Sequence, residues 1–238
     1  MIKLINEIPS FKKQNGAYAK ICSHFAAYSP YQNIALFWAQ FDDNNNPTAL
    51  FSMIDSVMML YFDNGDLDEL RSFLRAIAPK KIFTDLDTTL LLGLNIEVSC
   101  SVLYKRPPFE SNNQIENTYC GIDSLYDILS ERLNVGDRQA FIADMSHRIR
   151  HNAAAYVSSP FSAAAIIFDK NVAVINGIAV SKENAGKGLG SATLNRLLDG
   201  MKNRTVFVCA EEKNVPFYEK NGFVFCENAA YSNTNGVF

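Results

Sequence analysis

Short apolar runs separated by turn residues follow one another along the first half of the chain. Several of these runs are rich in aromatic and β-branched side chains, which predicts strands. Apolar residues at helical spacing follow Asp66, an N-cap with Glu69 three residues on, and predict a helix that stops at Pro79. The other expected elements are a helix around 18–27, strands at 34–41, 48–54, 57–62, 81–84 and 97–104, and a turn at 42–47.

The second half shows the same kinds of pattern in the same order. Apolar residues spaced as on a helix predict a helix at 122–133, and a short helix is expected at 137–143. Beyond them we expect strands at 148–157, 163–168, 172–180 and 205–210, helices at 194–201 and 214–221, and a last strand beginning at 223–226. Because both halves contain hairpin, strand, helix and strand, we predict an internal duplication of element order without a clear repeat of sequence.

A linker is expected between the halves. Arg106-Pro107-Pro108 leads into a polar stretch that has no periodicity. We therefore predict a first domain at 1–106, a linker at 107–117 and a second domain at 118–238.

The composition is that of an ordinary soluble globular protein. Hydrophobic residues make up 48% and charged residues 20% of the 238 residues, and the net charge of −3 does not suggest a nucleic-acid partner. No apolar run approaches the length of a membrane helix, and the N-terminus has no apolar core of the signal-peptide type. We expect a cytoplasmic protein, monomeric or homodimeric, without a membrane partner.

The cysteines are scattered and form no CxxC pair, which argues against a disulfide framework and a structural zinc site. We expect them to be buried thiols and expect no metal site. They are Cys22, Cys100, Cys120, Cys209 and Cys226.

A glycine-rich loop, Gly186-Lys187-Gly188-Leu189-Gly190-Ser191, joins a predicted strand to a predicted helix. Glycines allow sharp turns and a close approach of a ligand, and the first amides of a helix carry positive potential. Such a loop can hold a pyrophosphate, with Lys187 adding charge and Ser191 a hydroxyl donor.

Taken alone, the loop can also be an ordinary tight turn. No Lys-Ser/Thr pair follows its last glycine, so it is not a Walker loop. Its position after several hairpin-linked strands disfavours a nicotinamide cofactor, whose glycine loop follows the first strand of an alternating parallel unit.

A second motif follows at Asn214-Val215-Pro216-Phe217-Tyr218-Glu219-Lys220-Asn221-Gly222-Phe223. Together with Val174–Ser191, it resembles the GNAT superfamily of acetyl-CoA-dependent N-acetyltransferases, and the resemblance covers roughly Ile122 to Phe238. It implies an α/β (α+β) fold with a mixed, mostly antiparallel sheet flanked by helices, here in two lobes. It also implies an enzyme that moves an acetyl or longer acyl group from acetyl-CoA to an amine.

The resemblance also assigns roles to residues. In the family's loop pattern, Arg/Gln-x-x-Gly-x-Gly/Ala, the two glycines match Gly188 and Gly190, but Ala185 stands where Arg or Gln is usual. Tyr218 matches the tyrosine that protonates the departing thiolate in many members. The residues expected to bind the cofactor are Ile178, Ala179 and Val180 through their backbone, Gly186, Lys187, Gly188, Leu189, Gly190 and Ser191 in the loop, and Asn214 and Phe217.

The general base of the family has no direct counterpart in this chain. Many members carry a glutamate on the strand before the loop, where this chain has Asn176. Glu183, Glu211 and Glu212 are candidates that are more typical of solvent-facing positions. His147 and His151, expected on one face of a strand, are further candidates for lining an acceptor pocket.

The first half has Asp63-Asn64-Gly65-Asp66 at the equivalent junction, and its carboxylates would repel a pyrophosphate. We expect a degenerate GNAT-like lobe that binds no CoA and completes the sheet or walls the acceptor pocket. Two other hypotheses stay open. One is a CoA-binding regulatory module that has lost turnover, and the other is a first lobe that binds a protein.

Overall fold

The computed structural model describes residues 1–31, 33–107, 109 and 120–235. The chain divides into two compact units, one made of Met1–Tyr104 with Cys209–Phe238 and the other of Lys105–Val208. The final segment of the chain is therefore grouped with the N-terminal half. Most of the predicted linker at 107–117 lies outside the described residues.

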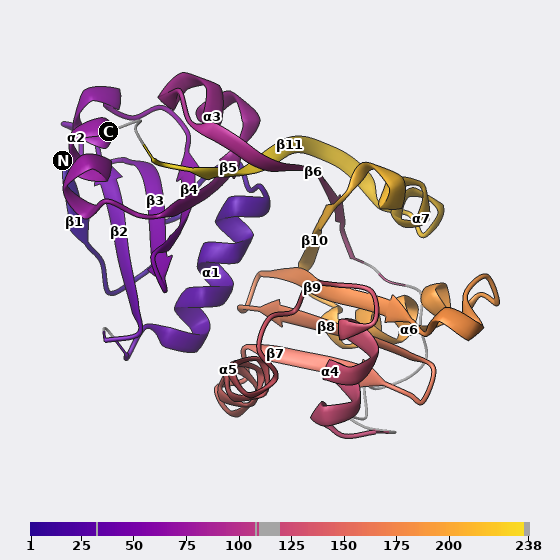
Figure 1. Cartoon of the computed structure of the whole chain (residues 1–238). Helices are drawn as coiled ribbons and strands as arrows, with labels where there is room; N and C mark the ends of the chain where they lie inside the picture. The colour runs from indigo at the N-terminus through magenta and orange to yellow at the C-terminus, as the bar shows by residue number, and fades with distance from the viewer. Residues whose placement is uncertain (32, 108, 110–119, 236–238) are drawn as a thin grey trace. The chain divides into compact units, whose positions relative to one another are not determined.

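The sheet of the first unit takes its strands from both ends of the chain. In spatial order they are β1 (Ile2–Leu4), β2 (Ala35–Phe41), β3 (Pro47–Ile54), β4 (Val57–Phe62), β5 (Lys81–Asp85), β11 (Val224–Asn233) and β6 (Asn95–Lys105). β4 and β5 are parallel, and the other pairs within this unit are antiparallel. Figure 1 shows the yellow β11 beside β5, although more than a hundred residues separate them along the chain.

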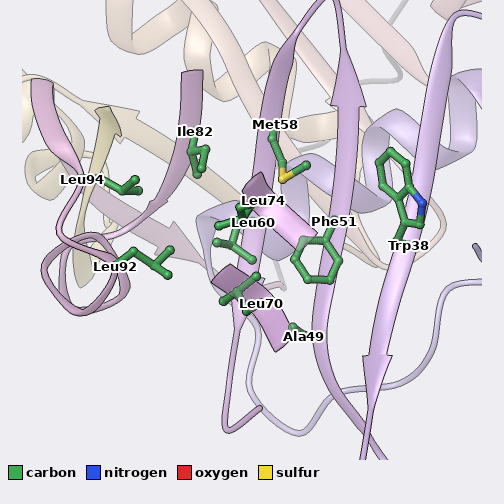
Figure 2. Packing of buried hydrophobic residues seen from close by; sticks show 10 residues of the cluster. All are labelled: Trp38, Ala49, Phe51, Met58, Leu60, Leu70, Leu74, Ile82, Leu92 and Leu94. Atoms are coloured by element: carbon green, nitrogen blue, oxygen red, sulfur yellow. The ribbon is translucent and has the colours of Figure 1, made fainter. Parts of the chain in front are cut away.

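Helix α2 (Leu67–Ile77) closes one face of this sheet, as its apolar spacing predicts. Leu70 and Leu74 are fully buried, and Figure 2 shows them directed toward Phe51 and Leu60 of the sheet. Asp66 caps the helix by accepting hydrogen bonds from the backbone N–H groups of residues 68 and 69. The helix ends at Ala78, which adopts the left-handed conformation just before Pro79.

The predicted capping box forms only in part. Its glutamate, Glu69, accepts from the backbone N–H of Ile2 at 2.7 Å and from Gln40 Nε2 at 2.9 Å. These bonds tie the start of the chain to α2, so Glu69 fastens the edge strand β1 to the helix that packs beside it.

The opposite face of the same sheet packs on α1 (Gly16–Tyr28). His24 lies 3.1 Å from Ser52 of β3, and the ring of Phe25 packs edge-on against Phe37 of β2. Side chains alternate between the two faces along a strand, so Glu227, Ala229 and Tyr231 of β11 point to the α1 side. Their register partners on β6 that share this face are Val102, Cys100 and Val98.

The second unit is a four-stranded sheet between helices. Its order is β10 (Thr205–Ala210), β9 (Val172–Val180), β8 (Ser162–Phe168) and β7 (Ala154–Ser158), with the last two residues of β10 grouped in the first unit. Only the pair formed by β9 and β10 is parallel among these described strands. α4 (Ile122–Ser130) and α6 (Leu189–Leu198) both contact β8, which explains why every residue of β8 is buried.

Each unit contains an antiparallel hairpin followed by a parallel pair joined through a helix. The connecting helix is α2 between β4 and β5 in one unit and α6 between β9 and β10 in the other. The predicted repeat of element order is confirmed, as is a mixed, mostly antiparallel sheet flanked by helices.

The strand predicted at 148–157 is wrong in its first part. Helix α5 (Arg138–Arg150) runs through the first three of those positions, and β7 begins only at Ala154. The ion pair from Arg148 to Asp144, one turn earlier at 2.8 Å, favours the helix, and Asn152 with φ of 53° ends it. A further helix, α3 (Leu86–Leu92), was not predicted; Asp85 caps it.

The packing of α2 makes a stability prediction. Leu74→Ala should lower the free energy of unfolding by about 2–5 kcal/mol, because it leaves a cavity between helix and sheet. Ser72→Ala, on the exposed side of the same helix, should change it by less than about 0.5 kcal/mol. Urea unfolding of both variants measures the difference; equal effects would contradict the packing described.

Candidate active site

The parallel strands β9 and β10 are paired along only part of their length. Pairing joins Val172–Ile175 to Thr205–Val208, so β9 continues for five residues, 176–180, beyond the paired stretch. Asn176 is an extra residue in the register with β8, which makes a β-bulge where this pairing ends. Because a bulge bends a strand and increases its twist, it helps to turn the end of β9 away from β10.

The three residues predicted to bind the cofactor through their backbone lie on this last stretch of β9. Ile178, Ala179 and Val180 pair with Ala164, Ala163 and Ser162 of β8, so one edge of the strand is occupied. The other edge lies beyond the pairing with β10. Backbone groups on that edge are placed to bond an extended ligand.

The glycine loop joins β9 to α6 through a 3₁₀ turn (Lys182–Asn184). Gly186 and Gly188 both have φ of 80°, in the left-handed region that side chains other than glycine rarely adopt. A Cβ built on either one meets no atom within 4 Å. Both glycines are therefore required by backbone conformation, and the space beside them is open.

The start of α6 has a run of unused backbone donors. The N–H groups from Gly186 to Ser191 donate to no residue in the described parts of the chain. Gly188 is the N-cap and has no side chain to satisfy them. Lys187, whose Nζ bonds Asn184 Oδ1 at 2.8 Å, adds a positive charge to the same exposed loop. Such donors, with the helix dipole, suit an anion.

The corresponding junction in the first unit is built differently. The first amides of α2 are already bonded to the carboxylate of Asp66. A Cβ on Gly65 would lie 1.8 Å from Gln40 Oε1, so the space beside this glycine is filled. The charge and the packing of this loop both agree with the expectation that it binds no pyrophosphate.

The second motif lies in the first unit, on α7 (Val215–Lys220) and the turn before it. Asn214 is exposed, and its side-chain amide has no hydrogen bond within the described ranges. Phe217 is half-buried, and its ring packs edge-on against Tyr218 with centroids 5.0 Å apart. The amide of Asn214 is thus available to a ligand.

Tyr218 combines a buried ring with an available hydroxyl. The residue is 6% exposed, and its ring packs on Phe223. Its hydroxyl bonds no described residue, yet it is not among the fully buried polar atoms that lack a partner, so it reaches the surface. Burial and the nearby Cys209 raise the pKa of Tyr218 well above its usual value. The phenol therefore stays protonated at neutral pH, as a proton donor must.

A carboxylate that the sequence did not single out lies in the same unit. Glu227 on β11 accepts from Asn15 Nδ2 at 3.2 Å and from the backbone N–H of Gly16 at 3.3 Å. Burial, with the charges of Asp85 and Cys209, raises the pKa of Glu227 to about 7, against the lowering effect of those two hydrogen bonds. A carboxylate with this pKa can accept a proton near neutral pH.

The candidates named from sequence for the base are exposed or lie at the end of a helix. Glu183, Glu211 and Glu212 are exposed. His147 and His151 lie at the end of α5 with ring centroids 4.4 Å apart, on a helix rather than the predicted strand. Asn176 is exposed at the bulge of β9. A glutamate within a predicted strand is the one sequence feature that could have drawn attention to Glu227. Whether that side chain faces inward depends on a strand register that the sequence does not show.

Two kinds of feature are absent from the described residues. None of the described helices combines the length and apolar character that crossing a membrane requires. Within residues 1–31, 33–107, 109 and 120–235, no three His, Cys, Asp or Glu side chains are grouped so that they could hold a metal ion.

Comparison with known protein families gives a match in the second half of the chain, which carries both motifs. Residues 124–236 match the family model described as an acetyltransferase (GNAT) domain. No curated protein sequence shows significant similarity to the chain.

Solved structures share the fold over most of the chain. The GCN5-related N-acetyltransferase of Kribbella flavida has a TM-score of 0.56 at 11% identity, covering 79% of this chain and 87% of its own. That of Sphaerobacter thermophilus has a TM-score of 0.55 at 11% identity and covers 90% of both. A tandem GNAT protein from the clavulanic acid biosynthesis pathway has a TM-score of 0.53 at 9% identity and covers 97% of both.

The fold is therefore that of GNAT proteins, including a tandem one, and the expected resemblance is confirmed. Residues 124–236 match a GNAT acetyltransferase domain, which supports a general acyl-transfer function for the chain.

Proposed function

We propose that this protein transfers an acetyl or related acyl group from acetyl-CoA to a primary amine by direct attack. The observation that carries the proposal is the run of unused N–H donors from Gly186 to Ser191, at a helix start with a glycine N-cap, inside a GNAT domain. A pyrophosphate is an anion that accepts several hydrogen bonds at once, which such a loop can supply.

The other residues that the family resemblance assigns to the cofactor offer further contacts. The free edge of Ile178–Val180 would bond the amides of the pantetheine arm, as an added strand does at a sheet edge. The exposed amide of Asn214 and the ring of Phe217 add a polar and an apolar contact. Ala185 supplies no charge where Arg or Gln is usual, and Lys187 is the cation that this loop offers instead.

The reaction needs one proton acceptor and one donor. The amine nitrogen attacks the thioester carbon, the C–S bond breaks, and an amide and free CoA result. We assign Tyr218 the role of donor, because its phenol is protonated and available and its released proton neutralises the departing thiolate. We assign Glu227 the role of acceptor of the amine proton, directly or through water.

Two observations support Glu227 as the base: its carboxylate is held in a fixed position, and its pKa is raised by its surroundings. Its carboxylate is held by Asn15 and Gly16 at the start of α1, so its position is fixed on the α1 side of the sheet. Cys209 acts electrostatically on both Glu227 and Tyr218, and all three residues belong to the first unit.

The second candidate function is a CoA-binding module without turnover, favoured by Ala185 and by the missing carboxylate at Asn176. Release of free CoA from acetyl-CoA with a panel of amines separates the two. Amine-dependent release supports the enzyme, and tight binding without release supports the module.

The loop assignment predicts the effect of Gly188→Glu. The new side chain would fill the open space at a position with φ of 80° and bring a negative charge to the phosphates. We expect at least about a hundredfold weaker binding of CoA by calorimetry, a loss of about 2.7 kcal/mol. Gly93→Glu is the matched control, with φ of 69° and equally open space at the end of α3. Unchanged CoA affinity in Gly188→Glu would contradict the assignment.

Tyr218→Phe should lower kcat by about 10²–10⁴-fold, because the thiolate loses its proton donor, while CoA affinity stays within about twofold. Tyr126→Phe, which removes a surface hydroxyl bonded to the backbone of Gly136, should leave both quantities unchanged. Steady-state kinetics and calorimetry measure the two effects separately. A variant with undiminished kcat would rule out the acid role.

If Glu227 is the base, the rate of acyl transfer should depend on pH. Since a base acts only when deprotonated, kcat/KM should fall as the pH drops below about 7, where the pKa of this group lies. Glu227→Gln should lower the plateau and remove this limb, leaving only the limb that belongs to the amine itself. Glu211→Gln, at an exposed position, should keep the wild-type profile. Persistence of the limb near pH 7 in Glu227→Gln would show that another group titrates.

A further inference from the structure

Lys20 lies over two aromatic rings on the α1 side of the first unit's sheet. Phe83 of β5 and Tyr231 of β11 are register partners, and their ring centroids are 4.7 Å apart. The Nζ atom of Lys20 lies 4.1 Å from the ring centroid of Phe83 and 5.0 Å from that of Tyr231. It also donates a hydrogen bond of 2.7 Å to the hydroxyl of Tyr231. Side chains from two neighbouring strands therefore fix the position of this ammonium group.

No carboxylate balances the charge of Lys20. In the parts of the chain that the structure describes, its ammonium forms no ion pair with an acidic side chain. Burial lowers the pKa of Lys20, but the charges of Cys209 and Tyr231 outweigh burial and raise the pKa above its usual value. Lys20 therefore stays charged at neutral pH. Because partly buried charges are usually paired, this ammonium group suits an anion from outside the chain.

The ammonium and the phenol together offer donors to such an anion. A lysine ammonium has three N–H donors, and Lys20 uses one of them on Tyr231. The hydroxyl of Tyr231 accepts this bond, and its own proton has no acceptor among the described residues. A carboxylate has two acceptor oxygens, so one can bond the ammonium while the other bonds the phenol. The pair is therefore suited to a carboxylate.

The pair is accessible from the β6 side of the sheet. Lys20 and Tyr231 are both half-buried, and Val98, the register partner of Tyr231 on β6, is 55% exposed. Cys100, the next residue of β6 on this face, is also partly accessible. The expectation of buried thiols is thus wrong for four of the five cysteines, since only Cys22 is buried. A ligand can approach the ammonium from this side.

Glu227, the proposed base, lies on the same face of β11 four residues before Tyr231. Four residues of an extended strand span roughly 13 Å, and no register shift interrupts β11 between these two positions. The same helix contacts both places. The backbone N–H of Gly16 bonds Glu227, and Lys20, one turn later on α1, bonds Tyr231. The base and the ammonium are therefore held at separate points along one strand.

We propose that Lys20 and Tyr231 bind a carboxylate that is carried by the amine acceptor. This inference rests on the proposed acyl transfer and narrows its acceptor to amines with a carboxylate at their far end. An α-amino acid, whose amine and carboxylate share one carbon, is too short to reach both Glu227 and Lys20. An ω-amino acid such as 6-aminohexanoate is longer and can place its amine at the base and its carboxylate at the ammonium.

The first test compares two amines with the full chain. 6-Aminohexanoate and hexylamine present the same kind of amine on chains of equal length, but only the first carries a carboxylate. We expect wild type to have a kcat/KM at least about tenfold higher for 6-aminohexanoate, as one charge-assisted hydrogen bond provides. Lys20→Met should lower this ratio about tenfold, and Lys20→Arg should keep most of it, since it keeps the charge.

Lys3→Met is the matched control. Lys3 also lies over an aromatic ring, with its Nζ 4.3 Å from the ring centroid of Phe41, but on the edge strand β1. Its replacement should leave the ratio between the two amines at the wild-type value. An equal fall of the ratio in Lys3→Met and Lys20→Met would show a general effect of charge and would contradict a site at Lys20.

A binding measurement separates this inference from the acyl transfer itself. Calorimetry with hexanoate, a carboxylate without an amine, requires no turnover. Wild type should bind hexanoate at least about tenfold more tightly than Lys20→Met, shown to be folded by circular dichroism. Such binding in a protein that releases no CoA with any amine would count against the transfer and leave the anion site standing. Equal hexanoate affinity in the two proteins, or no measurable binding to wild type, would overturn the inference.

Discussion

The pairing of β11 with both β5 and β6 is the interaction on which the chemistry of the first unit depends. The last strand of the chain enters a sheet built by the N-terminal half, with register partners on both sides. This insertion brings Glu227 and Tyr231 onto the face that α1 covers and carries α7, with Tyr218, into the same unit. The last strand of the region matched at 124–236 therefore pairs with strands from the first half of the chain.

The two helix starts show how one element order serves two purposes. At α2, Asp66 supplies the acceptor that the first amides need, and Gln40 fills the adjacent space. At α6, Gly188 supplies neither side chain nor charge, and the amides remain unused within the described residues. The difference between a structural turn and an anion site is thus the presence or absence of one capping carboxylate. Because that difference is local, the amino-acid sequence alone reveals it.

Sequence predicted the features that depend on neighbouring residues. The strands of the first hairpin, the Asp66 cap and the strand-to-helix placement of the glycine loop all follow from local pattern. It failed at 148–150, which were expected to begin a strand, because the pairing of Arg148 with Asp144 favoured a helix. It also missed Glu227, since the face of a residue in β11 depends on partners more than a hundred positions away. Side-chain roles that arise from such distant pairing cannot be derived from local periodicity.

The electrostatics of the first unit couple the proposed acid and the proposed base through one neighbour, Cys209. The charge of the Cys209 sulfur raises the pKa of Lys20, of Tyr218 and of Glu227. For Tyr218 this keeps the proton that a leaving thiolate needs. For Glu227 it adds to burial in bringing a carboxylate close to neutral pH, where it exchanges protons readily. Loss of that negative charge would make Tyr218 a stronger acid and Glu227 a weaker base at the same time. Because the Cys209 sulfur shifts the pKa of both groups in the same direction, Tyr218 and Glu227 must be considered together as one titrating system.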